Sequence, residues 1–269
     1  MTARPRVLVT RPQPQADEWV ARLEALGQPA AALPLLAIKP VPADDPALQA
    51  AWAALPATRL VMFVSPNAVA SFMAGRPAGW AWPGTLLAGA TGPGTVAALR
   101  AAGVPEPAIA APRPDAAQFD AETLWQHRLQ QETWAGRRVL VVRATEGRDW
   151  LSQTLREHGA EVQPLAAYQR CTPRWTPAQV DRLRQALADP AAWAWLFSSS
   201  EAIAQLPALL AAHGLVAQGE GLPPALLAMP ALATHPRIAV SAQAAGFALV
   251  QQLLPDPEVV AQALGRNAA

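Results

Sequence analysis

The sequence predicts an α/β protein of two similar lobes with parallel sheets and a cleft between them. Residues 6–33 resemble residues 138–165 without a gap, at an offset of 138 − 6 = 132. Apolar strand-like runs alternate with segments of helical periodicity, which is typical of parallel sheets. Both copies place polar turns after their strands. Because ligands of such sheets bind beyond the carboxyl ends of the strands, we expect both lobes to face one ligand.

The first part of the chain alternates strands and helices. A β-branched run is followed by apolar residues at helical spacing up to Gly27, a residue type favoured just after a helix. Ser65 and Pro66 are typical of the N-cap and the first residue of a helix. The predicted strands are residues 7–9, 60–64, 85–88 and 109–111, residues 33–41 are extended, and one helix covers residues 119–132.

The second part follows the same course. A loop without a counterpart in the first copy covers residues 214–224. The predicted strands and extended segments are residues 138–142, 161–172, 195–198, 231–234 and 247–250. The predicted helices are residues 147–158, 177–188, 200–213, 236–245 and 257–264.

Composition narrows the classes of function. The net charge of +1 gives no support for nucleic acid or a membrane surface as the main partner. Cys171 is the sole cysteine, so an internal disulfide is excluded and the chain fits the reducing cytoplasm. We find no signal-peptide pattern and no apolar run long enough to span a membrane, and we therefore expect a cytoplasmic protein.

Four turns between a strand and a helix carry small polar residues. Ser65 and Ser199 each precede a helix, where a serine either caps the first N–H groups or leaves them to bind an anion. For one serine alone both interpretations stay open. Four such turns on two lobes favour a polyanion site, with Ser65, Thr91, Gly92, Thr95, Ser199 and Thr234 as its residues.

Other kinds of site are disfavoured. The loop GATGPGT at residues 89–95 lacks the lysine and the glycine spacing of nucleotide-binding loops. The four histidines are scattered without a metal-like pair, and no spacing indicates a catalytic triad. We therefore expect neither a metal nor an organic cofactor.

Three arginines are candidates for ligand contacts. Arg11 and Arg143 end equivalent strands, and each either pairs with an aspartate of the following helix, Asp17 or Asp149, or contacts the ligand. Arg148, in the turn after the strand, is the better candidate for a carboxylate clamp.

Tyr168 is the only tyrosine of the chain, on an extended segment where one lobe would give way to the other. By position alone, packing of its ring on the core is the favoured interpretation. A phenol that faces the cleft would instead donate a proton to a leaving group.

Taken together, these segments resemble the uroporphyrinogen-III synthase family. The resemblance covers nearly the whole chain, and the order and spacing of its motifs make it specific. It rests on VLVTRP, FVSPNAV (63–69), the Thr-Gly-Pro-x-Thr loop, VLVVRATEGRDWL, AAYQR, LFSSSEAI (196–203) and THPRIA (234–239).

The resemblance implies flavodoxin-like lobes that exchange chain segments. One lobe would comprise residues 1–38 and 172–269, and the other residues 39–171. Two extended crossings, near residues 37–41 and 167–173, would form a two-stranded linker. The repeat alone leaves this arrangement and two sequential lobes equally open.

The resemblance also implies a reaction. In that family hydroxymethylbilane, a linear tetrapyrrole with acetate and propionate side chains, loses water, and its last ring is inverted as the macrocycle closes. Tyr168 matches the tyrosine suggested to protonate the departing hydroxyl. Residues that match turns facing the cleft are Ser65, Asn67, Thr95, Arg148, Ser199 and Ser200. The segment THPRIAVSA departs from the family pattern, since His235 and Arg237 stand where small residues are usual.

We expect the cyclising synthase, acting as a monomer, with transient contact to the preceding enzyme of the pathway as an option. The alternative is a non-catalytic two-lobed binding protein for a small polyanion. Tyr168 and the paired serine turns favour the enzyme.

Overall fold

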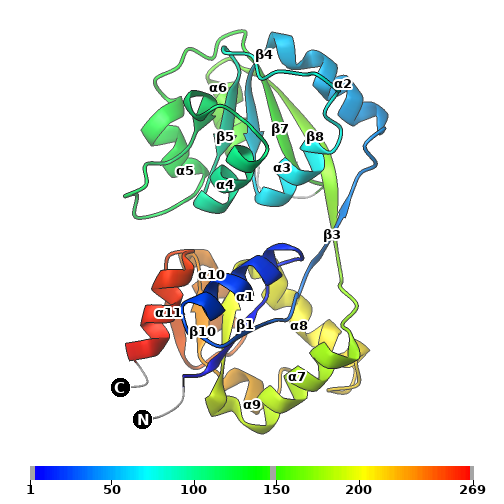
Figure 1. Cartoon of the computed structure of the whole chain (residues 1–269), viewed down its shortest axis with the longest axis vertical. Helices are drawn as coiled ribbons and strands as arrows, with labels where there is room; N and C mark the ends of the chain where they lie inside the picture. Colours follow the sequence, from blue (N-terminus) through cyan, green and yellow to red (C-terminus); the bar gives the residue numbers. More distant parts are fainter. Residues whose placement is uncertain (1–3, 146–149, 267–269) are drawn as a thin grey trace. The chain divides into compact units, whose positions relative to one another are not determined.

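The computed structural model describes residues 4–145 and 150–266. Its chain divides into two compact units. Met1–Ala37 and Cys171–Ala269 form the discontinuous unit, and Ile38–Arg170 form the central unit. The chain therefore passes from one unit to the other twice, and Figure 1 shows both passages near β3 and the end of β8.

The discontinuous unit is a parallel sheet with the strand order β2-β1-β9-β10-β11. In the unit's own chain order this is 2-1-3-4-5, the flavodoxin-like arrangement. Its strands are β1 (Arg6–Val9), β2 (Ala30–Ala32), β9 (Trp193–Phe197), β10 (Ala231–Ala233) and β11 (Val250–Gln252). Its helices are α1 (Gln15–Ala25), α7 (Pro177–Ala188), α8 (Ser200–Ala212), α9 (Pro224–Leu227), α10 (Pro236–Ala244) and α11 (Pro257–Arg266).

In the central unit the strands that are equivalent by the repeat lie in the same spatial order, β8-β7-β4-β5-β6. The strand β3 is added beside β8. The pairs β8–β7, β7–β4, β4–β5 and β5–β6 are parallel. Its strands are β3 (Ala37–Pro40), β4 (Thr58–Phe63), β5 (Leu87–Ala90), β6 (Ile109–Ala110), β7 (Arg138–Ala144) and β8 (Glu161–Cys171). Its helices are α2 (Pro46–Ala54), α3 (Pro66–Met73), α4 (Pro93–Ala101), α5 (Ala121–Leu124) and α6 (Trp150–Glu157). The predicted α/β class with two lobes of parallel strands is confirmed.

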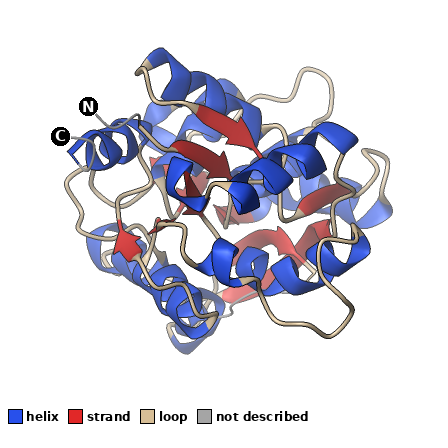
Figure 2. Ribbon diagram, turned by 90° about the horizontal axis from the view of Figure 1, so that it is seen from below, coloured by secondary structure: helices blue, strands red, loops and turns tan. Residues whose placement is uncertain are grey.

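Both sheets are buried on both faces, and helices cover their strands (Figure 2). In β1 the side chain of Leu8 packs into one hydrophobic cluster, and those of Val7 and Val9 pack into another. In β4 Val61 and Met62 separate in the same way. This double burial is why the strands are nearly continuous apolar runs in the sequence.

Helix ends follow the local sequence signals closely. Gly27 has a φ value of 69° after the end of α1, as predicted, and Gly103 has a φ value of 78° after the end of α4. The helix α2 was not predicted, because the prolines near residue 46 indicated only turns. Pro46 is in fact the first residue of α2, after Asp45, whose carboxylate accepts hydrogen bonds from two backbone N–H groups.

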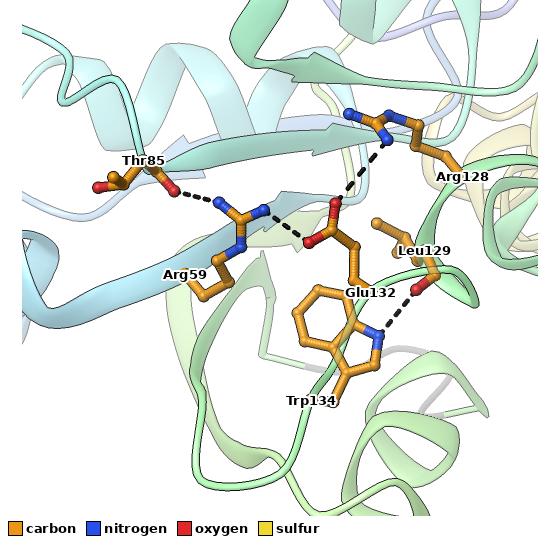
Figure 3. Close-up of polar contacts among 6 residues, drawn as sticks. All are labelled: Arg59, Thr85, Arg128, Leu129, Glu132 and Trp134. Atoms are coloured by element: carbon orange, nitrogen blue, oxygen red, sulfur yellow. Dashed lines mark hydrogen bonds and ion pairs between the residues drawn. The ribbon is translucent and has the colours of Figure 1, made fainter.

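The segment 119–132, predicted as one helix, divides into α5 and the π-helical turn Trp125–Leu129. The carbonyl of Leu129 accepts the indole N–H of Trp134 (Figure 3). Glu132 pairs with Arg59 of β4 at 2.6 Å, and Arg59 also donates to the carbonyl of Thr85. The predicted helix is therefore shorter, residues 121–129, and its second half is π-helical, while Glu132 and Trp134 make these contacts beyond its end.

Smaller differences concern strand ends. The strand predicted at residues 85–88 is β5, Leu87–Ala90, and the one predicted at 247–250 is Val250–Gln252, since Phe247 packs into the core after Gly246. The predicted loop at residues 214–224 ends where the short helix α9 begins. None of the described helices is long and apolar enough to cross a membrane.

Candidate active site

Four helices begin directly after the carboxyl end of a parallel strand. Their N-cap residues are Ser65, Gly92, Ser199 and His235, and all four have an extended backbone. In α3 and α8 the serine hydroxyl accepts a backbone N–H, from Ala68 at 3.2 Å and from Ala202 at 3.4 Å. The capping interpretation of both serines is therefore confirmed. Capping leaves the other N–H groups of the first turn for a ligand.

Ser65 makes a second contact through its side chain. Its Oγ lies 2.9 Å from the hydroxyl oxygen of Tyr168, and either atom could be the donor. The tyrosine is 1% exposed and packs with the apolar cluster on one face of the central sheet. The core packing of Tyr168 is therefore confirmed, and its hydroxyl in addition contacts Ser65.

A β-bulge turns Tyr168 toward Ser65. Arg143 of β7 pairs with Ala166 of β8, but the next residue, Ala144, pairs with Tyr168, so Ala167 is an extra residue. In a regular strand Ala167 and Tyr168 would face opposite sides of the sheet. The bulge places both in the same buried cluster. This irregularity has no signal in the sequence.

The turn from β5 to α4 has no side-chain cap. Gly92 is the N-cap residue and Pro93 the first helical residue, so the first N–H groups of α4 lack a hydroxyl partner from the cap. Thr95 is buried in the first turn, and Thr91 is partly exposed. Asn67, the second residue of α3, is also partly exposed.

At the starts of α8 and α10, two hydroxyl groups donate their protons to backbone carbonyl groups. Thr234 donates to the carbonyl of Phe197 at 3.3 Å, and Ser200 donates to the carbonyl of Arg237 at 3.4 Å. The Nδ1 atom of His235 accepts the N–H of Arg237 at 3.2 Å. The unusual histidine therefore replaces the serine as the helix cap.

Arg11 follows β1 in the discontinuous unit. Its guanidinium lies over the ring of Trp19, with 4.5 Å between Cζ and the ring centroid. Its Nε is buried without a hydrogen-bond partner among the described residues. Burial lowers the pKa of Arg11 to about 10. Because Nε of Arg11 is buried and has no hydrogen-bond acceptor among the described residues, the guanidinium is suited to bind a carboxylate.

The predicted pairing of Arg11 with Asp17 is not found. Asp17 accepts a hydrogen bond from Gln13 at 3.1 Å, and no ion pair of Arg11 is formed within the described part of the chain. Trp19 was not predicted as the partner of Arg11. Arg143 lies in β7 near its carboxyl end. Arg148 and Asp149 lie outside the described residues.

These residues belong to different units. Ser65, Asn67, Thr91, Gly92, Thr95, Arg143 and Tyr168 are in the central unit, and Arg11, Ser199, Ser200 and Thr234 are in the discontinuous unit. Within residues 4–145 and 150–266, no group of three or more His, Cys, Asp or Glu side chains could hold a metal ion.

Comparison with known proteins gives one family. The family model of uroporphyrinogen-III synthase HemD matches residues 17–253. The uroporphyrinogen-III synthase of Salmonella typhimurium is 33% identical over 174 residues, which are 64% of this chain and 68% of that protein. The uroporphyrinogen-III synthase of Escherichia coli is 34% identical over 174 residues, with the same coverage.

Two solved structures share the fold. A mutant uroporphyrinogen III synthase from Thermus thermophilus has a TM-score of 0.55 at 19% identity, covering 97% of this chain and 98% of that one. The uroporphyrinogen-III synthetase of Helicobacter pylori has a TM-score of 0.52 at 16% identity, covering 99% and 100%. At these identities the likeness concerns the fold alone.

Proposed function

The chain belongs to the uroporphyrinogen-III synthase family and has that activity in tetrapyrrole biosynthesis, and we propose that its substrate is hydroxymethylbilane. In the proposed reaction the substrate loses its terminal hydroxyl as water. The last pyrrole ring then attacks the methylene carbon of the resulting azafulvene and is inverted through a spiro intermediate. The macrocycle then closes to uroporphyrinogen III.

The observation that carries the proposal is the contact between Ser65 and Tyr168 beside the N-terminus of α3. Loss of a hydroxyl needs a proton, and the phenol of Tyr168 is the proposed source. The contact places this proton at the carboxyl edge of a parallel sheet, where ligands of such sheets bind. Later steps need mainly positioning of the reactive intermediate.

The carboxylates of the substrate would be held by two kinds of donor. The N–H groups at the starts of α3, α4, α8 and α10 are suited to anions. The guanidinium of Arg11 would offset its burial by pairing with one carboxylate. The hydroxyls of Ser200 and Thr234 would contribute mainly as acceptors or through their backbone, since their protons are donated to carbonyl groups. Asn67, Thr91, Thr95, Arg143, Arg148 and Ser199 complete the proposed binding set.

We propose that the two compact units act as the two domains of the enzyme, each contributing residues that bind the substrate. The domain boundaries expected from the resemblance, residues 1–38 with 172–269 and residues 39–171, each differ by one residue from those of the compact units. A cytoplasmic location and a monomeric state are further parts of the proposal. Cell fractionation and light scattering on the purified chain test them.

The isomer of the product tests the function. The purified chain is supplied with hydroxymethylbilane, and the products are oxidised and separated as porphyrins. We expect the type III isomer in excess over a control without protein, which forms the type I isomer spontaneously. Formation of the type I isomer alone would contradict the proposal and favour the non-catalytic polyanion-binding protein.

A further inference from the structure

The phenol of Tyr168 is buried, but the proposed chemistry takes place on a ligand. The side chain is 1% exposed, and its ring lies in the apolar cluster of the central unit. Its hydroxyl has one hydrogen-bond partner among the described residues, the Oγ of Ser65 at 2.9 Å. Ser65, in contrast, is partly exposed at the turn between β4 and α3. A ligand at this turn reaches the serine before the tyrosine.

The number of hydrogen bonds that each group can make sets the direction of this contact. A phenol O–H that is buried needs an acceptor, and Ser65 Oγ is the acceptor within reach. The serine oxygen has two lone pairs. One accepts the N–H of Ala68 at 3.2 Å, and the other accepts the phenol proton. The serine's own proton is then directed away from both partners. The reverse direction would leave the buried phenol proton without an acceptor.

We propose that Ser65 is a catalytic residue, which touches the departing hydroxyl of the substrate and relays to it a proton from Tyr168. The inference rests on the proposed function and deepens it. In the ground state the hydrogen bonds run from the Tyr168 hydroxyl to Ser65 Oγ, and from the Ser65 hydroxyl to the substrate oxygen. The tyrosine is the proton source, and the serine is the contact.

The step is balanced in protons and electrons. The bond between the substrate carbon and its hydroxyl oxygen breaks, and the oxygen keeps the electron pair. That oxygen takes the proton of Ser65 Oγ and leaves as water, while Ser65 takes the proton of Tyr168. The phenolate that remains accepts a hydrogen bond from the reprotonated serine. When the macrocycle closes, the pyrrole carbon loses a proton, which returns through Ser65 to Tyr168.

The N-terminus of α3 favours the charged state of this pair. The backbone N–H of Ala68 points at Ser65 Oγ, and the partial positive charge of the helix N-terminus lies beside the developing phenolate. A group preorganised toward the charge that develops in the reaction stabilises the transition state more than the ground state.

The repeat supplies a matched control for the test. Ser199 caps α8 as Ser65 caps α3, but among the described residues its side chain has a single hydrogen bond, accepted from the N–H of Ala202. Its unit has Leu36 where the other has Tyr168, at the offset 168 − 36 = 132. Ser65→Ala and Ser199→Ala therefore each remove one helix cap, but Ser65→Ala alone removes a partner of the tyrosine.

The experiment measures kcat and KM for Ser65→Ala, Ser65→Thr, Ser199→Ala, Tyr168→Phe and the double variant Ser65→Ala/Tyr168→Phe. We expect Ser65→Ala to lower kcat about 10²-fold, as for the loss of a general acid. The double variant should be no slower than Tyr168→Phe, because both changes break one relay. Ser65→Thr should retain most of kcat, and Ser199→Ala should act mainly on KM.

A second readout does not depend on turnover. Because the chain has one tyrosine, a Cζ isotope label in tyrosine gives a single NMR signal that reports Tyr168. This signal should shift in Ser65→Ala and stay in place in Ser199→Ala. An unshifted signal would contradict the contact on which the relay depends.

Failure of the relay and failure of the function are distinguishable. An active wild type whose Ser65→Ala variant loses no more kcat than Ser199→Ala overturns the relay alone. The relay is also overturned if kcat of the double variant falls by the product of the two single reductions, because the two changes would then act independently. A wild type that forms only the type I isomer overturns the proposed function, and with it the catalytic part of the inference.

Discussion

The two units contain the same turn with different chemistry. Each has a parallel strand, a serine N-cap and a helix, at β4–Ser65–α3 and at β9–Ser199–α8. In the central unit the serine hydroxyl contacts Tyr168, which stands on an eleven-residue strand with a bulge. In the discontinuous unit the equivalent strand, β2, has three residues, and Leu36 is buried in the core. A duplicated scaffold thus provides two serine-capped turns, and in the central unit a bulge brings the hydroxyl of Tyr168 to one of them.

The two units also differ at an equivalent pair of arginines, and here the discontinuous unit has the additional aromatic contact. Arg11 and Arg143 are equivalent at the offset 143 − 11 = 132, but Arg11 lies over Trp19, whose counterpart at 19 + 132 = 151 is Leu151. The discontinuous unit therefore holds its guanidinium against an aromatic ring. In the proposed mechanism one unit would supply the acid, Tyr168, and the other a cation, Arg11.

We expect the largest effect from removing the hydroxyl group of Tyr168. The equivalent position of the other unit, Leu36, is already apolar. Tyr168→Phe keeps the ring in its buried site and removes the hydroxyl. We expect kcat to fall about 10²-fold, because the proton source is lost, with little change in the affinity for the product. Steady-state kinetics and calorimetric titration with uroporphyrinogen III measure both quantities. A wild-type rate would remove Tyr168 from the mechanism.

The arginine difference is tested by Arg11→Met. We expect KM to rise about tenfold, because a carboxylate loses its cation. We also expect the free energy of unfolding at neutral pH to rise by about 1 kcal/mol, since the cost of burying a cation that has no ion pair among the described residues exceeds the contact with Trp19. Denaturant titration measures the second effect, and Arg143→Met is the matched control. A less stable variant would contradict the interpretation of Arg11 as an uncompensated cation.

The pH dependence of this stability difference follows from the lowered pKa of Arg11. Folding disfavours the protonated form, so the cost to the wild type is fully present at neutral pH. The cost declines as the pH rises through about 10, where Arg11 in the folded state loses its proton. The advantage of Arg11→Met in unfolding free energy should therefore decrease above that pH. An advantage that grows with pH would contradict the assignment.

The smallest expected effect concerns the amino ends of the strands. Arg59 of the central unit pairs with Glu132, whereas its counterpart in the other unit, Trp193, lies beside Arg6. We expect Glu132→Gln to lower the unfolding free energy by about 1 kcal/mol and to leave kcat unchanged, because the pair is only partly exposed and remote from Tyr168. Glu106→Gln, in the exposed pair with Arg100, should lower the unfolding free energy by less, and thermal melting of both variants measures the difference. Equal losses would contradict a special role for the Glu132 contact.

Much of the fold was predictable because its signals are local. Apolar runs marked the strands, and Ser65-Pro66 and Gly27 marked a helix start and a helix end. The helix that begins at Pro46 was missed because a proline after Asp45 is as typical of a turn as of a helix start. The two lobes with parallel sheets followed from the repeat, and the exchange of chain segments between them followed from the family resemblance.

The site was harder to predict because its contacts join distant parts of the chain. Ser65 and Tyr168 are 103 residues apart, and the bulge at Ala167 that turns the phenol depends on pairing with β7. The contact of Arg11 with Trp19 competes with a plausible ion pair to Asp17, and composition gives no means to choose. Residue types suggested the donors, and tertiary packing selected their partners.

The double passage of the chain between the units has a consequence for biosynthesis. The central unit is one continuous segment, so all of it has been made before Trp193 leaves the ribosome. Strand β1 pairs with β9 through Arg6 and Trp193, a separation of 193 − 6 = 187 residues. Because domains fold as units during synthesis, we expect the middle of the protein to fold first. The sheet of the discontinuous unit is completed only after β9 has been made. A nascent chain stopped before residue 193 would contain the complete central sheet, and β1 and β2 without β9.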